Sequence, residues 1–370
     1  GATWIGEPGA GPAPWLDALA RARAQVDVNA YLLTDPVLLQ ALRADAARGV
    51  RVRVLLAAAP YRDAAAPQGT AQALAGSGVH LRQAPRRFPY DHATKYWLVD
   101  PGQPDAEAIL GSPNGTASAF DGRNLEDAVA TTNPAVVRAL AAVFQADWQG
   151  RPAGPAPRRT LVLSPHSTAA LLGLLRTPGP VAVMGEELGD DPTVLAAMAA
   201  KGGRLRLLLP APLSPADRAR AAALARQGVP VRLLAAPYPH AKLVLTAHRV
   251  FVGSQNWSLT SLQDNREVGL VLTHSSVHTQ AAAWFRHWWA VAQPLTAASG
   301  ARKAPDSIPK TRLPWLPLGI SPKSVRARWG PPSAVQSGTW AGQPAEVWRY
   351  AGATAWFVAG RLVAVHRHAG

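Results

Sequence analysis

Short apolar runs alternate with amphipathic stretches along most of the chain, which predicts strands alternating with helices. The segment from Val26 reads as an apolar strand, an Asp-Pro pair, a helix, a glycine and a second apolar strand. The segment from Val181 repeats this order. Asp35 and Asp191 each precede a proline, so the carboxylate can cap the helix while the proline takes its first position. The repeat predicts a duplicated α/β unit.

Further elements extend each copy in the same way. A helix precedes each copy, and a helix followed by a strand comes after it, at residues 15–23, 70–74, 79–82, 167–175, 214–226 and 229–234. Such alternation favours a mixed, largely parallel sheet with helices on both faces. A last helix over 275–293 carries Trp284, Trp288 and Trp289, and side chains at this helical spacing are more typical of a core than of a lipid contact.

Two proline-bearing segments divide the chain into domains. At 370 residues it is too long for a single ordinary core. We expect an α/β first half at 1–152, an α/β second half at 153–293, a linker at 294–317 and a small α+β domain at 318–370. The last segment, with its Gly-Pro-Pro turn at 330–332 and later strand pattern, resembles a small domain of some bacterial envelope lipoproteins.

One order of polar residues, His, Lys, Gly-Ser-x-Asn and Asn-x-Glu, occurs once in each half. Before residue 300 the chain has only three lysines, and two of them fall in these motifs, as do four of the six asparagines in the whole chain. A solvated surface would not concentrate its rarest polar residues in this way. The two sets are His92, Lys95, Ser112, Asn114, Asn124 and Glu126, and His240, Lys242, Ser254, Asn256, Asn265 and Glu267.

These residue types suit attack on a phosphodiester. Its phosphorus is shielded by negative oxygens, so a site needs positive charge and hydrogen-bond donors around it. One neutral histidine can attack phosphorus while a second protonates the leaving oxygen. A glutamate bonded to the other ring nitrogen would fix the imidazole. Lysines can supply the charge, so we expect no metal and no other cofactor.

The chain is similar to the phospholipase D superfamily over residues 1–293, because it carries two sets of that family's His-x-Lys motif. The resemblance implies a duplicated α/β/α sandwich whose halves, related by a pseudo-twofold axis, share one site. It also implies a covalent phosphohistidine. The resemblance assigns chemical attack and proton transfer to the two histidines, His92 and His240. It assigns phosphate binding to the lysines and the Gly-Ser-x-Asn residues, which are Lys95, Lys242, Ser112, Asn114, Ser254 and Asn256. It assigns orientation of the histidines to Glu126 and Glu267.

The motifs depart from the family pattern in two places. Two residues separate His92 from Lys95, so we expect a β-bulge that turns His92 toward His240. Ala247 stands where the second motif would have an aspartate. A binding protein without catalysis is therefore an alternative, marked by a His92 that points away from the site. Glu186 and Glu187 align with Tyr31 and Leu32 in the repeat, and a solvated strand end is favoured for them over a position that borders the site.

The chain carries 38 Lys+Arg against 23 Asp+Glu, a formal net charge of +15. This excess favours a polyanionic partner, and Arg82, Arg86 and Arg87 precede the first motif. We expect a nuclease acting on nucleic acid, with a phospholipase or phosphatidyltransferase as the alternative and contact with an anionic membrane surface left open. A monomer suffices to build the site. An exported protein without its leader is favoured over a cytoplasmic one.

Overall fold

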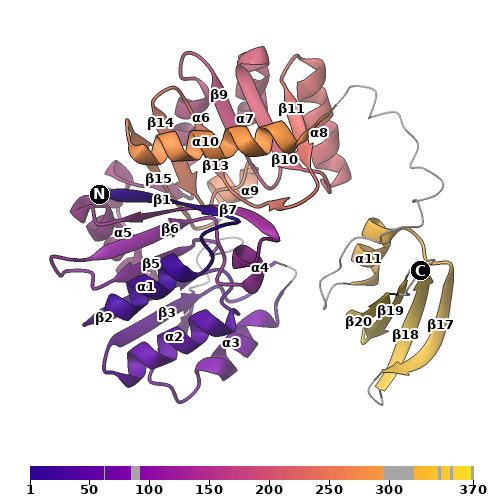
Figure 1. The fold of residues 1–370 in the computed structure, drawn as a ribbon, viewed down its shortest axis with the longest axis horizontal. Coiled ribbons are helices and arrows are strands. Elements are labelled where there is room, and N and C mark those ends of the chain that lie inside the picture. Colours follow the sequence, from indigo (N-terminus) through magenta and orange to yellow (C-terminus); the bar gives the residue numbers. More distant parts are fainter. Residues whose placement is uncertain (62, 85–91, 296–320, 341–342, 351–352, 368–370) are drawn as a thin grey trace. The chain divides into compact units, whose positions relative to one another are not determined.

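A computed structural model describes residues 1–61, 63–84, 92–295, 321–340, 343–350 and 353–367 (Figure 1). The chain divides into a unit of residues 1–300 and a unit of residues 301–370. The first unit contains both copies of the repeat and all twelve motif residues. Arg86 and Arg87 lie outside the described residues.

The first half is built on a mixed sheet. Its strands, in spatial order, are β1 (Ala2–Glu7), β7 (Asn124–Thr131), β6 (Glu107–Gly111), β5 (Tyr96–Val99), β2 (Gln25–Ala30), β3 (Arg51–Leu56) and β4 (His80–Gln83). One face packs on α1 (Ala13–Arg21), α2 (Pro36–Ala47) and α3 (Ala66–Leu74), and the other packs on α5 (Pro134–Trp148). The short helix α4 (Ala117–Phe120) precedes β7.

The second half repeats this plan. Its strands follow the order β16 (Gln293–Pro294), β11 (Val231–Leu234), β10 (Leu205–Pro210), β9 (Val181–Met184), β13 (Leu243–Leu245), β14 (Arg249–Gly253), β15 (Glu267–Thr273) and β8 (Val162–Ser164). The helices α6 (Thr168–Leu175), α7 (Pro192–Lys201) and α8 (Pro215–Arg226) cover one face, and α10 (Ser276–Val291) covers the other. Shorter helices are α9 (Leu259–Gln263), η1 (Ala156–Arg159) and η2 (Gly202–Arg204).

The predicted duplication is confirmed, but the sheets are less parallel than expected. Along the two strand orders given above, the parallel pairs are β2–β3 and β3–β4 in the first half and β9–β10 and β10–β11 in the second, and the other pairs are antiparallel. The reason is that the motif-bearing strands return as hairpins instead of through helical crossovers. Strand β12 adds one parallel pair, with β7, across the two halves. Both helix starts form as predicted: Asp35 accepts from the backbone N–H groups of Val37 and Leu38, and Asp191 from those of Thr193 and Val194.

The two halves are joined through their backbones. Strand β12 (Tyr238–Pro239) of the second half pairs in parallel with the start of β7 in the first half. The matching contact on the other side is an isolated bridge between His92 and Arg266. Side chains of β8 and β15 also share a core with α5. The motif segments of both halves therefore meet along one seam.

The C-terminal unit has the predicted helix followed by a meander. It consists of α11 (Pro322–Trp329) and an antiparallel sheet of β17 (Ala334–Trp340), β18 (Gln343–Tyr350), β19 (Ala353–Val358) and β20 (Arg361–Arg367). Val325, Trp329, Trp348 and Phe357 contribute to its core. Among the described helices of the whole chain, none has the length and apolarity needed to cross a bilayer.

Candidate active site

His240 and Lys242 lie on the extended segment between β12 and β13, where the second half crosses to the first. The backbone N–H of His240 donates to the carbonyl oxygen of Leu125, over 3.0 Å. Because alternate side chains of an extended chain leave the same face, His240 and Lys242 point to the same side. The seam between the halves thus fixes both residues.

A buried glutamate from the other half holds the His240 ring. Glu126 Oε2 lies 2.7 Å from His240 Nδ1, and the same carboxylate accepts from Ser112 Oγ at 2.5 Å and Asn124 Nδ2 at 3.0 Å. Burial would raise the pKa of Glu126, but His240 and Lys242 hold it below its ordinary value. An ionised carboxylate can only accept, so Nδ1 of His240 carries a hydrogen toward Glu126.

Glu186 lies directly against this reactive edge. Its Oε2 is 3.4 Å from His240 Nε2 and 2.9 Å from Lys242 Nζ, while Oε1 is 3.5 Å from the Tyr238 hydroxyl. Burial would raise the pKa of Glu186, but Lys242 and His240 lower it to about 2. The expected solvated strand end is therefore wrong. The repeat alignment could have identified Glu186 as a residue of the site, because it placed Glu186 just after a strand that leads to the motifs.

In the first half, Ala93 occupies the place that His240 has in the second. The N–H of Ala93 donates to the carbonyl oxygen of Arg266 at 3.0 Å, which is the counterpart of the bond from His240 to Leu125. Lys95 Nζ donates to the carbonyl oxygen of Ala93 at 2.7 Å, as Lys242 Nζ does to that of His240. The two lysines are thus equivalent, and the residue two places before Lys95 is alanine.

His92 lies on the opposite side of the chain. Its Nε2 is 3.0 Å from Asn29 Oδ1 of β2, and it belongs to the side of the sheet that α5 covers, with Asp147 Oδ2 3.9 Å away. Burial, with a smaller effect of Arg266, lowers the pKa of His92 to about 3, so the ring is neutral and makes no ion pair with Asp147. The expected bulge that would turn His92 toward His240 is wrong, because His92 bonds to Asn29 while Lys95 turns back to the carbonyl oxygen of Ala93.

Glu267 matches Glu126 in position but lacks an imidazole beside it. Its Oε1 accepts from Ser261 Oγ at 2.8 Å and from Asn265 Nδ2 at 3.2 Å. Its Oε2 is buried and has no hydrogen-bond partner within the part of the chain that the structure describes. Burial raises the pKa of Glu267, although Lys95 opposes this. The carboxyl group is in place, but the ring it would orient is missing.

The Gly-Ser-x-Asn loops divide into buried and accessible members. Ser112 and Ser254 are fully buried and serve the local framework: Ser112 contacts Glu126 and Asp127, and Ser254 bonds to the backbone of Val268. Asn114 and Asn256 are only partly buried. In the described structure the asparagines, and not the serines, can therefore donate to a ligand.

Two aspartates close to the motifs act on the backbone. Asp100 accepts from the N–H groups of Arg23, Ala24 and Gln25 at 2.7–2.8 Å, so it holds the turn before β2. Asp127, which the sequence analysis missed, accepts from the N–H of Lys242 at 3.1 Å, and burial raises its pKa to about 7.

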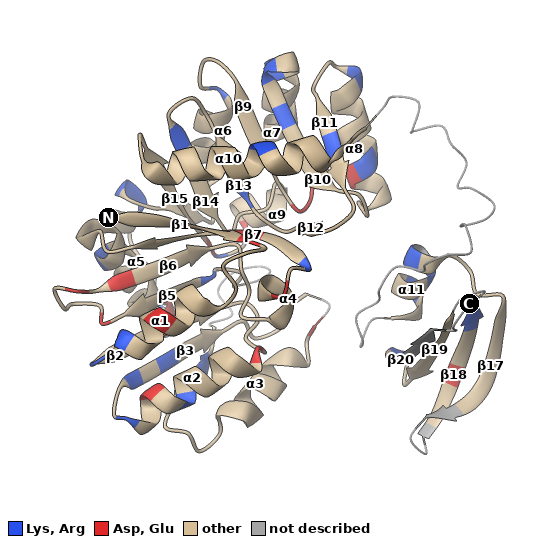
Figure 2. Cartoon of the chain, viewed as in Figure 1, with Lys and Arg blue, Asp and Glu red and all other residues tan. Residues whose placement is uncertain are grey.

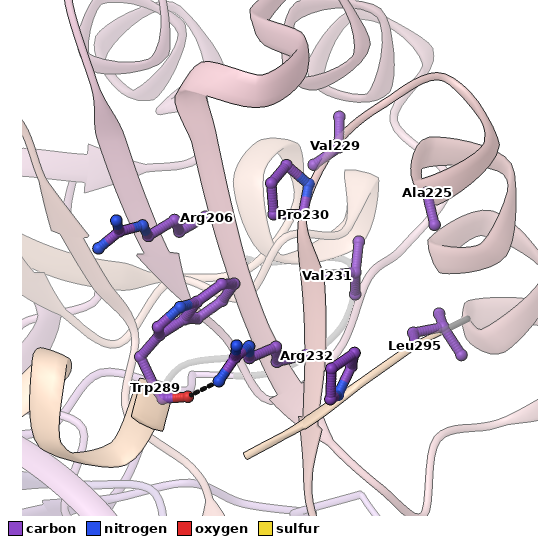
Figure 3. A pocket seen from close by; sticks show the side chains of 9 residues that line it. Arg206, Ala225, Val229, Pro230, Val231, Arg232, Trp289 and Leu295 are labelled. Carbon is purple, nitrogen blue, oxygen red and sulfur yellow. Dashed lines mark hydrogen bonds between the residues drawn. The ribbon is translucent and has the colours of Figure 1, made fainter. Parts of the chain in front are cut away.

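A separate pocket of about 420 Å³ lies in the second half (Figure 3). Arg206 and Arg232 flank the Trp289 ring there, with their guanidinium carbons 5.9 Å and 5.0 Å from its centroid. These arginines stand near the amino ends of β10 and β11, whereas Glu186 follows the carboxyl end of β9. The pocket is therefore not part of the His240 site.

Comparison with known families agrees with the fold. A family model described as "Cardiolipin synthase, PLD-like domain" matches residues 15–148 and 191–289, more than half of the chain. The chain therefore belongs to the phospholipase D superfamily, whose members are phosphodiesterases or phosphotransferases. Among proteins with curated functions, none matches this sequence.

Two solved structures, a polyphosphate kinase and a phosphatidylserine synthase, share the duplicated fold at low identity. The polyphosphate kinase of Porphyromonas gingivalis superposes with a TM-score of 0.60 at 15% identity, over 78% of this chain and 50% of the kinase. This chain thus spans half of that protein. The phosphatidylserine synthase of Haemophilus influenzae Rd KW20 gives 0.59 at 11%, over 80% and 87%. Nuc, a phospholipase D family member of Salmonella typhimurium, gives 0.35 at 26%, over 40% and 94%.

Proposed function

We propose that this chain is a phosphodiesterase that needs no metal and works through a covalent phosphohistidine on His240. The observation that carries the proposal is the pair formed by the partly buried His240 and the buried Glu126 beside two lysines. Glu126 keeps the hydrogen on Nδ1, so Nε2 can attack phosphorus. Lys242 and Lys95, which are 2% and 8% exposed, supply fixed positive charge for the phosphoryl oxygens.

The position of the Glu186 carboxylate supports this assignment. One of its oxygens contacts both His240 Nε2 and Lys242 Nζ, as an oxygen of a bound phosphoryl group would. An anionic substrate would displace this carboxylate and take over its bond with Lys242. Asn114 and Asn256 would donate to the remaining oxygens, while Ser112, Asn124, Ser254 and Asn265 hold the framework behind them.

As ligand class we favour nucleic acid, or a nucleotide, over phospholipid. Figure 2 shows Lys and Arg residues on α7, α8 and α10 and in the region of α2 and β3, and such charge attracts polyanions. The tryptophans of α10 pack against the protein: Trp284 lies edge-on to Trp4, and Trp289 stacks on Phe285. This removes one reason to expect a membrane contact through that helix.

The proposal is tested with bis(4-nitrophenyl) phosphate in EDTA. Because Nε2 would be the attacking atom, we expect His240→Gln to lower the rate by ~10³-fold or more. His92→Gln is the matched control, since it removes a histidine of the same motif that lies outside the site, and it should stay within about threefold of the wild type. Quenching in alkaline denaturant, which preserves the P–N bond, should trap the phosphoryl group on the wild-type chain and on His92→Gln only.

Single-stranded DNA and phosphatidylglycerol vesicles, compared in the same buffer, identify the ligand class. Salt-sensitive binding of DNA and not of vesicles would support the nucleotide side. No turnover and no trapped phosphate, with binding retained, would replace the proposal by a phosphodiester-binding protein without catalysis.

A further inference from the structure

The two halves of the site differ in whether an imidazole lies next to the motif glutamate. In the second half, Glu126 orients an imidazole; in the first, the equivalent Glu267 faces Ala93. Within the proposed function, we propose that the site selects phosphodiesters and phosphoanhydrides whose leaving oxygen departs as a stable anion, because the first half offers no imidazole to protonate it.

Two observations show that the first half has no imidazole at the place of His240. They are the backbone geometry at Ala93 and the surroundings of the Glu267 carboxyl group. Ala93 and His240 make the same bond to the opposite half, and Lys95 and Lys242 each turn back to the residue two places earlier. Glu267 is 1% exposed, and no described histidine bonds to its Oε2, although the Ser254 side chain lies close enough to lower the pKa of the carboxyl group. In the His240 half the matching oxygen accepts from Nδ1 at 2.7 Å.

The other acidic groups at the site are poor proton donors for a leaving oxygen. His240 and Lys242 keep the pKa of Glu126 low and bring that of Glu186 to about 2, so both are ionised near pH 7. The raised pKa of Glu267 allows it to hold a proton. However, in the His240 half the glutamate lies behind the ring, so a whole imidazole separates this position from the reacting atom.

Lys95 is a further candidate among the described residues, because burial lowers its pKa to about 8. Its ammonium group donates to the carbonyl oxygen of Ala93 at 2.7 Å and supplies charge next to the buried carboxylates. Giving up a proton in the transition state would remove that positive charge when the phosphoryl oxygens need it most. Lys95 is therefore better suited to hold the phosphoryl group than to protonate the leaving oxygen.

The reaction balances without an acid. The lone pair of His240 Nε2 forms the P–N bond, and the bond from phosphorus to the leaving oxygen breaks with its electron pair on that oxygen. Water then attacks phosphorus, the P–N electrons return to Nε2, and one water proton passes to solvent. The first step is fast when the leaving group is a phenolate or a phosphate. It is slow when the leaving group is the alkoxide of a sugar or glycerol. Within the ligand class favoured above, the expected substrate is therefore a nucleotide anhydride or aryl ester, and not an internucleotide link of DNA or RNA.

The test compares thymidine 5′-phosphate esterified to 4-nitrophenol with the same nucleotide esterified to methanol, in EDTA, with thymidine diphosphate esters as the phosphoanhydride series. Once the uncatalysed background is subtracted from each observed rate, the wild type should cleave the aryl ester at least ~10³-fold faster than the methyl ester. Ala93→His should speed methyl ester cleavage by ~10²-fold or more, and aryl ester cleavage by less than about threefold.

Two controls separate proton donation from side-chain bulk. Ala93→Asn adds a polar side chain with no titratable proton and should give no gain. Combining Ala93→His with Glu267→Gln should remove most of the gain, because the new imidazole then lacks the carboxylate that orients it.

Each outcome of these measurements either supports or contradicts the inference. Strong aryl preference in the wild type, with a gain for the methyl ester in Ala93→His, supports the inference. If the wild type cleaves both esters at similar corrected rates, another group supplies the proton and the inference is wrong, although the proposed function stands. If no ester is cleaved in a His240-dependent way, the proposed function fails and the inference fails with it.

Discussion

Side chains of an extended segment point alternately to opposite sides of the chain. At residues 92–95 this alternation determines which side chains face the site. Ala93 and Lys95 share one side, while His92 turns toward Asn29 and the layer of α5. A histidine that looks catalytic from its place in a motif is thus a buried neutral residue. The same alternation places His240 beside Lys242, where only one residue separates them.

The buried His92 makes stability depend on pH. Its pKa is 6.5 when unfolded and about 3 when folded, so between these values the unfolded chain binds more protons and acid favours unfolding. The stability that His92 gives is complete above pH 6.5 and is lost as the pH falls toward 3. We expect the advantage of the wild type over His92→Gln to shrink by ~1–3 kcal/mol between pH 7 and 4.5.

Urea unfolding at several pH values measures this difference. His80→Gln, which removes an exposed histidine, is the control and should run parallel to the wild type. A constant gap between wild type and His92→Gln across this range would show that the folded protein accepts a proton at His92.

At the scale of elements, the Asp-Pro pairs set where the repeated helices begin. Asp35 is 6% exposed, and its Oδ1 accepts from the N–H groups of Val37 at 2.9 Å and Leu38 at 3.1 Å. Without this acceptor two buried or half-buried N–H groups lose their partner. The cap also fixes the direction in which α2 leaves the loop after β2.

Asp35→Ala is expected to lower the free energy of unfolding by ~1–2 kcal/mol. Asp35→Asn keeps an oxygen acceptor at the same position and should lose less than half of that. Both variants are measured by urea unfolding at pH 7. An equal loss in the two would mean that the charge, and not the hydrogen bonds, stabilises the helix start.

At the scale of the whole molecule, a buried ion pair links the halves behind the site. Arg266 donates to Asp147 Oδ1 of α5 at 3.0 Å and to the carbonyl oxygen of Ser164 at 3.1 Å. Asp147 is fully buried and Arg266 is 4% exposed. Arg266 also takes part in the backbone bridge that holds the His92–Lys95 segment against the second half. Packing between the halves and the geometry of the site are therefore coupled.

Asp147→Asn should cost ~3–5 kcal/mol of stability, because it leaves a buried guanidinium without its counter-charge. The exposed Asp17→Asn is the control and should change stability by less than ~0.5 kcal/mol. Urea unfolding followed by tryptophan fluorescence reports both. A loss below ~1 kcal/mol for Asp147→Asn would show that water or another group compensates the charge.

Local signals in the sequence were sufficient for the duplicated α/β plan, the helix starts at Asp35 and Asp191, and the side-by-side placement of His240 and Lys242. Each depends on neighbouring residues, such as a cap, a strand period or a repeated spacing. The Asn-x-Glu motifs likewise identified Glu126 and Glu267 as part of the site.

Contacts between segments that are distant in the sequence determined the orientation of the first motif and the carboxylates that contact His240. The bond from Ala93 to Arg266 sets the register of the first motif, and spacing alone could not choose between a bulge and a straight strand. Glu126 reaches His240 from the other half, and Glu186 reaches both His240 and Lys242 across the second sheet. Such contacts depend on how strands align across the seam, and that alignment is a property of the packed fold, because no local segment specifies it.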